Sequence, residues 1–172
     1  MTVSMQSLAL AARKLTLQER HKSGELKSEY FEKWLKITGE EIEFFDLETS
    51  VALWNCKWRT TQVREYEGRV EDSFSEIFTR LKTFPDSKVF CFTYCWMKTG
   101  VFITSLSTLI NHFNELMFIS EDEIGAFSSD LKRGLEFEGD RSGSWDKLNF
   151  LSVSLSGDWS VLWNDYSERN NG

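Results

Sequence analysis

The stretch that most constrains the fold is "SKVFCFTYCWMKTGVFITS", residues 87–105, which is rich in aromatic and β-branched side chains. Its apolar residues occupy both alternating positions, since Val89 and Cys91 are interleaved with Phe90 and Phe92. Successive side chains of a strand point to opposite faces of its sheet, so this strand must be buried on both faces. The stretch therefore predicts a central strand in a sheet that helices or a partner cover.

Apolar residues recur at helical spacing in several other segments. The predicted helices carry their stripes at residues 8–17, where the pattern is less regular, and at 26–35, 70–81 and 106–117. Gly39 is well placed to end the helix that contains residues 26–35. Beyond it, Ile42 and Phe44 alternate like a short strand, whereas residues 48–67 fit both a helix and a strand and stay open.

Near the C-terminus, residues 149–165 have the pattern of a hairpin. A strand at 151–155 would pair with a strand at 159–163 around Ser156-Gly157-Asp158, because a short loop with glycine suits such a turn. Trp159 and Trp163 would then share one face of the hairpin. Packing of that face on the protein's own sheet is the favoured interpretation, and a patch that binds a partner is the alternative.

Helices and antiparallel strands in separate blocks predict an α+β fold. A length of 172 residues suits one domain, so we expect residues 1–172 to form a single domain built on a mainly antiparallel sheet. N-terminal helices and two further helices would pack on this sheet. Within the domain, residues 1–38 form a helical segment that packs on the body at 39–172 or serves as an arm that packs on a second copy.

The number of cysteines and the pattern of the N-terminal residues indicate the cellular compartment. Three cysteines are too few, and odd in number, for a disulfide scaffold. The apolar N-terminal patch lacks a basic region ahead of it and is interrupted by Arg13, Lys14 and Gln18, so neither a signal peptide nor a membrane span is predicted. We therefore expect a cytoplasmic protein that does not associate with a membrane.

Charge is distributed unevenly along the chain. Residues 101–140 hold eight acidic and two basic side chains, and no lysine or arginine occurs between Thr99 and Leu131. Such a region repels the phosphate backbone of nucleic acid and attracts a basic surface, so the predicted partner is another protein with a basic net charge. The predicted partner-binding residues are Glu115, Glu121, Asp122, Glu123, Asp130, Glu136, Glu138, Asp140, Trp159 and Trp163.

The pattern of residues gives little support for a catalytic site or a metal site. A pair of Cys91 or Cys95 with His112 is geometrically feasible, but two cysteines that pack as small apolar residues are favoured. The acidic run Glu121–Glu123 lacks the ligand spacing of a calcium loop and suits a solvated turn. We predict no catalytic residue, no metal site and no cofactor.

Three classes of function fit these observations. The first is a small acidic protein that binds and neutralises another protein, such as an immunity protein or antitoxin directed against a basic, nuclease-type toxin. The chain is similar to such proteins in size and acidity but shares no motif with them. The alternatives are an enzyme with a cysteine or carboxylate centre, and a structural homo-oligomeric module assembled through residues 1–38. The oligomeric state stays open.

Overall fold

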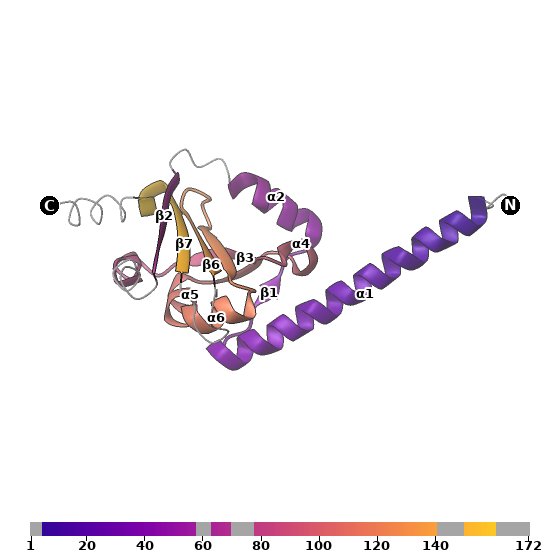
Figure 1. Ribbon diagram of the computed structural model, residues 1–172, viewed down its shortest axis with the longest axis horizontal. Helices are drawn as coiled ribbons and strands as arrows, with labels where there is room; N and C mark the ends of the chain where they lie inside the picture. The colour runs from indigo at the N-terminus through magenta and orange to yellow at the C-terminus, as the bar shows by residue number, and fades with distance from the viewer. Residues whose placement is uncertain (1–4, 58–62, 70–77, 141–149, 161–172) are drawn as a thin grey trace.

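The computed structural model describes residues 5–57, 63–69, 78–140 and 150–160 (Figure 1). Within these residues, seven antiparallel strands form one sheet in the order β1-β4-β3-β5-β6-β7-β2. The strands are β1 Glu43–Phe44, β2 Val63–Arg69, β3 Lys88–Thr93, β4 Phe102–Ser105, β5 Glu123–Ser128, β6 Gly134–Asp140 and β7 Phe150–Ser156. The helices are α1 Met5–Thr38, α2 Leu47–Lys57, α4 Trp96–Thr99, α5 Leu106–Asn111, α6 Phe113–Ile119 and the 3-10 helix η1 Gly157–Ser160. The predicted α+β fold is confirmed.

Strand β3 is buried on both faces, as its sequence predicts, but it ends at Thr93, and the stretch 87–105 continues into helix α4 and then strand β4. It lies inside the sheet between β4 and β5. Val89 and Cys91 belong to one apolar cluster, and Phe92 belongs to a second cluster on the opposite side. We call the side of the sheet with Val89 and Cys91 the first face, and the side with Phe90 and Phe92 the second face.

Helices α1, α5 and α6 cover the first face. Trp34 of α1 is fully buried and meets the Phe102 ring edge-on, with 5.0 Å between the ring centroids. Leu109 of α5 and Leu116 of α6 are buried in the same cluster, which extends to strands β6 and β7. Because the cluster reaches so many strands, the first face forms the main core of the protein.

The predicted helix at 106–117 is present but interrupted. His112 has φ −115° and ψ 23°, which ends α5 and starts α6. Ser105 caps the first of these helices, since its hydroxyl accepts a hydrogen bond from the backbone N–H of Thr108 at 3.0 Å. Of the helix predicted at 70–81, only residues 78–81 lie within the described residues, and they are helical.

On the second face, short helices α2 and α4 cover the region around β3. Trp54 of α2 stacks on Trp96 of α4 with 4.6 Å between ring centroids and meets Phe92 edge-on at 4.8 Å. The Phe92 ring also lies directly over Gly125 of β5, where a side chain would overlap it. This second cluster is smaller than the core on the first face.

The segment at 48–67, which the sequence leaves open, holds both a helix and a strand. Its first part lies in α2 and its last part lies in β2. Asp46 caps α2, because its carboxylate accepts a hydrogen bond from the backbone N–H of Thr49 at 2.7 Å, and that bond lowers the pKa of Asp46. The short strand expected just before it is confirmed as β1, which contains Phe44.

A single continuous helix, α1, replaces the two N-terminal helices that the sequence suggests. Gly24 lies inside it with open space around its Cα, so nothing in the body forces a break there. From Ser23 onward the helix contacts the body, beginning with a hydrogen bond from the Ser23 hydroxyl to the carbonyl oxygen of Lys98. The preceding half projects away from the body (Figure 1). The helix ends at Gly39, as predicted, with a φ of +72°.

The predicted C-terminal hairpin is wrong. Its first strand is present as β7, but β7 pairs with β6 on one side and with β2 on the other, so neither edge is open to a second hairpin strand. Residues 159 and 160 lie in η1, and residues 161–163 lie outside the described residues. The chain instead enters η1 at Gly157, whose φ of +63° and close approach to the carbonyl of Lys132 suit only glycine. Ser156-Gly157-Asp158 therefore ends β7 without returning the chain as a strand.

The contact between Phe92 and Gly125 provides a first test of this fold. A methyl group at Gly125→Ala would overlap the Phe92 ring, so we expect the free energy of unfolding to fall by roughly 1–3 kcal/mol, the usual cost of overpacking a core. Gly24→Ala is the matched control, because its methyl group meets open space in a helix and should stabilise by about 0.5–1 kcal/mol. Urea unfolding of both variants measures the difference, and an equal effect in the two would contradict the packing.

Candidate partner-binding surface

The part of the second face that lies beyond β5 carries polar side chains. Glu136 and Glu138 of β6 alternate with the buried Leu135 and Phe137, so the two carboxylates point away from the main core. On β7, serines 152 and 154 take the corresponding positions opposite Glu138 and Glu136. Glutamates and serines thus share one side of two neighbouring strands.

Glu123 extends this surface onto β5. It lies directly opposite Glu138 in the antiparallel pairing of β5 with β6, so the two side chains are on the same face. Gly125, the next residue on that face of β5, lies opposite Glu136 and under the Phe92 ring. The acidic residues therefore begin where the aromatic cover of the second face ends. We call Glu123, Glu136 and Glu138 the acidic sheet face.

The register also places two glutamates of β2 in the same rows. Glu65 is the partner of Ser154, and Glu67 is the partner of Ser152. One row across the sheet therefore reads Glu123, Glu138, Ser152 and Glu67. This long-range pairing joins residues that are far apart in the sequence.

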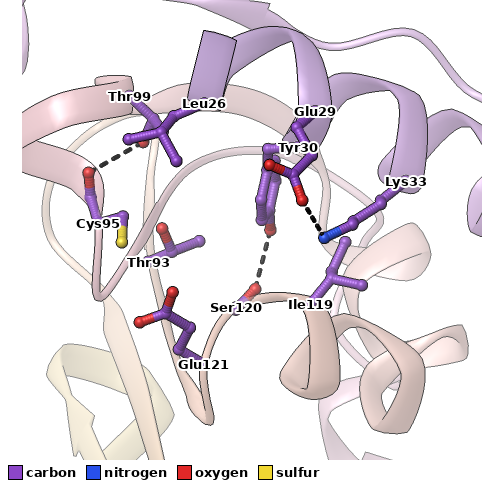
Figure 2. A pocket seen from close by; sticks show the side chains of 10 residues that line it. All are labelled: Leu26, Glu29, Tyr30, Lys33, Thr93, Cys95, Thr99, Ile119, Ser120 and Glu121. Carbon is purple, nitrogen blue, oxygen red and sulfur yellow. Dashed lines mark hydrogen bonds and ion pairs between the residues drawn. The ribbon is translucent and has the colours of Figure 1, made fainter. Parts of the chain in front are cut away.

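The acidic turn before β5 lies at the end of the sheet. Glu121 and Asp122 both have positive φ, 55° and 65°, a conformation that costs free energy in residues other than glycine. Glu121 lines a small pocket between α1, the end of α6 and the turn that follows β3 (Figure 2). Across it, the Tyr30 hydroxyl is hydrogen-bonded to the Ser120 hydroxyl at 2.8 Å. The sequence did not single out Tyr30 or Ser120, since only the fold brings them together.

Two other predicted acidic residues, Asp130 and Glu115, lie apart from the acidic sheet face. Asp130 is in the loop between β5 and β6, where the Ser128 hydroxyl donates to its carboxylate and lowers its pKa. An ion pair with Arg133, at 3.7 Å, also reduces its effect on a partner. Glu115 is exposed on α6, which covers the first face. Asp140 is the last residue of β6, and its side chain lies outside the described residues.

The two tryptophans do not form the alternative surface patch within the described residues. Trp159 is fully buried in the main core, with the Arg133 guanidinium 5.8 Å from its ring centroid. A buried indole cannot contact a partner, so the prediction that Trp159 binds a partner is wrong. Trp163 lies outside the described residues.

The surroundings of Cys91 and Cys95 disfavour the thiolate form of both side chains. Burial raises the pKa of Cys91, which is fully enclosed in the main core. Burial and the nearby Glu121 carboxylate also raise the pKa of Cys95. Because the thiolate is the reactive form, both shifts oppose the cysteine-centred enzyme. Among the described residues, no three His, Cys, Asp or Glu side chains are grouped to hold a metal ion.

Comparison with protein-family models, with curated proteins and with solved structures finds no match for this chain. In the part of the chain that the structure describes, no helix combines the length and apolar character needed to cross a bilayer.

The environment of Cys95 yields a second test. Glu121→Gln removes the negative charge that raises the Cys95 pKa, so we expect alkylation of Cys95 by iodoacetamide at pH 8 to become severalfold faster. Glu115→Gln, which removes an exposed charge on α6, should leave that rate unchanged. Peptide mapping by mass spectrometry resolves Cys95 from the other thiols. A rate that does not respond to Glu121→Gln would contradict the proposed effect of its charge.

The burial of Trp159 yields a third test. Trp159→Ala should lower the free energy of unfolding by about 3–5 kcal/mol, because it empties a large volume in the core. Trp159→Phe should cost much less, since the indole Nε1 has no hydrogen-bond partner among the described residues. Chemical unfolding followed by circular dichroism measures both. If Trp159→Ala were tolerated, the core position of this residue would be wrong.

Proposed function

We propose that this protein binds a basic protein through its acidic sheet face and neutralises it. The observation that carries the proposal is the strand register, which puts Glu123 next to Glu138 and both near Glu136, on a part of the sheet beyond the aromatic cover. A stable β-sheet has no need of glutamates directly opposite each other, because like charges in that position are destabilising. Recognition of a cationic surface gives the arrangement a use.

Electrostatic attraction would act mainly on the rate of association. A surface of one sign attracts a partner of the opposite sign over about 10 Å at ordinary ionic strength and speeds their encounter. An inhibitor that must reach a toxin before its substrate does gains from this. We therefore propose an immunity protein or antitoxin that acts in the cytoplasm against a nuclease-type toxin, whose own site must be basic to bind nucleic acid.

A fourth prediction tests the proposal with matched charge variants. The triple variant Glu123→Gln, Glu136→Gln, Glu138→Gln removes three charges from the acidic sheet face, whereas Glu32→Gln, Glu41→Gln, Glu115→Gln removes three exposed charges elsewhere. Wild-type and control protein should retain the same basic partner from the native host in stoichiometric amount, and the triple variant should lose it. The purified pair should associate at least tenfold more slowly when salt is raised from about 50 to about 500 mM, because the salt screens the attraction. The triple variant should show a similar decrease in association rate at low salt, because its substitutions remove the attracting charges.

Two results would contradict the proposal. One is an association rate that depends equally on the two sets of charges, which would indicate a general effect of net charge. The other is a purified partner whose toxic or nuclease activity is unchanged by an excess of this protein. The second result would leave binding intact and remove the neutralising role.

The projecting half of α1 supports a second candidate function, a homo-oligomeric module. Most of the stability of a helix in a protein comes from the packing of one of its faces, so a partner helix would stabilise the projecting half. Deletion of residues 1–22 spares Tyr30 and Trp34, which pack on the body. If α1 joins two copies, the deletion converts a dimer to a monomer in sedimentation equilibrium. An unchanged mass in solution removes this candidate.

A further inference from the structure

The pocket beside Glu121 is small and is open to one end of the sheet (Figure 2). It has a volume of about 100 Å³ and lies where α1, the end of α6 and the turn after β3 meet. Leu26 and Ile119 give it apolar walls, and Thr93, Ser120 and Glu121 give it polar ones. The volume is sufficient for the head of one side chain and its last methylene groups, but not for a whole nucleotide or cofactor.

Thr93 places a polar side chain at the wall of the pocket. Thr93 is only 3% exposed and lines the pocket, and its hydroxyl makes no hydrogen bond to any residue within the described ranges. The Thr93 hydroxyl is not one of the fully enclosed polar atoms that lack a partner, so it is accessible from the pocket, where a donor group of a ligand can replace water. Neighbouring polar groups are already paired, as the bond between Tyr30 and Ser120 shows.

The charges around the pocket favour a cation. Glu29 and Lys33 form an ion pair with 2.6 Å between the carboxylate and the ammonium group, so they largely cancel each other. Glu121 then leaves one negative charge at the pocket. Carboxylate and hydroxyl oxygens accept hydrogen bonds, and an ammonium group supplies three donors and no acceptor. A phosphate or carboxylate ligand would be repelled by Glu121.

We propose that this pocket receives the ammonium group of a lysine side chain from the basic partner, with the Glu121 carboxylate and the Thr93 hydroxyl as its acceptors. This inference rests on the proposed function and gives it a specific contact. The lysine stem would pack on the apolar walls, while the surrounding basic surface of the partner reaches the acidic sheet face. Glu121 and Glu123 are two residues apart, so one partner can engage both.

The direct test uses n-butylammonium as a mimic of the lysine side chain, with the full-length protein labelled with ¹³C at threonine methyl groups. We expect a saturable shift of the Thr93 methyl resonance, and little response to n-butanol, butyrate or n-butylguanidinium at the same concentration. Glu121→Gln should weaken n-butylammonium binding by about tenfold or more, the loss expected for one charge-assisted hydrogen bond, whereas Glu115→Gln should not change it. Equal responses to butanol and butylammonium would overturn the proposal.

Thr93→Val separates a binding role from a structural one. It replaces an unpaired hydroxyl with a methyl group of similar size, so a purely structural Thr93 predicts equal or higher stability and unchanged binding of the amine. Our proposal predicts that stability is kept while n-butylammonium binding falls severalfold. Bound n-butylammonium should also slow alkylation of wild-type Cys95, which lines the same pocket. Absence of both effects would overturn the assignment.

The outcomes distinguish this inference from the proposed function. If the triple variant of the acidic sheet face loses the basic partner while Glu121→Gln and Thr93→Val retain full affinity, the pocket assignment fails and the proposed function stands. If n-butylammonium binds as expected but no basic partner is found, the proposed function fails and the pocket remains a site for amines.

Discussion

Burial of β3 on both faces is the constraint on which the rest of the structure depends. A strand with apolar side chains on each side requires cover on each side, which α1, α5 and α6 supply on the first face and α2 and α4 supply on the second. The two covers differ in extent. Seven strands about 4.8 Å apart make a sheet about 29 Å wide, whereas a helix is about 10 Å across. Among the described residues, α2 and α4 therefore cover the strands near β3, and β6 and β7 present polar residues on the second face.

The limited cover explains why this face carries polar side chains, but it does not explain why several of them are glutamates. Serine or threonine at every position would satisfy the need for polar side chains, as serines 152 and 154 do on β7. Glutamates at positions 123, 136 and 138 instead place like charges at neighbouring positions on one face of the sheet. Recognition of a basic partner is the use that we propose for this arrangement.

Local pattern predicted the elements better than their pairing. The alternation of Val89, Phe90, Cys91 and Phe92 identified a central strand, and the turn at Gly39 identified the end of α1. The hairpin failed because the pairing of β7 with β2 and β6 depends on contacts far apart in the sequence, which a nearby glycine turn cannot reveal. The candidate surface was predicted in part for the same reason. Charge counts found the glutamates, but only the register showed that Glu123, Glu136 and Glu138 share a face while Glu115 does not.

The turn at Glu121 and Asp122 links the two candidate sites. Both residues adopt positive φ, and this sharp turn directs Glu121 into the pocket on the side of α1 while Glu123 enters β5 and faces the opposite side of the sheet. Cys95 lies near both glutamates, since both carboxylates contribute to the rise in its pKa. The sequence of Glu121–Glu123 suggests one solvated acidic turn, but its carboxylates lie on two sides of the end of the sheet. A partner that contacts both Glu121 and Glu123 must surround that end of the sheet. Its basic surface therefore has to be concave, or one of its lysines has to project beyond the surrounding surface.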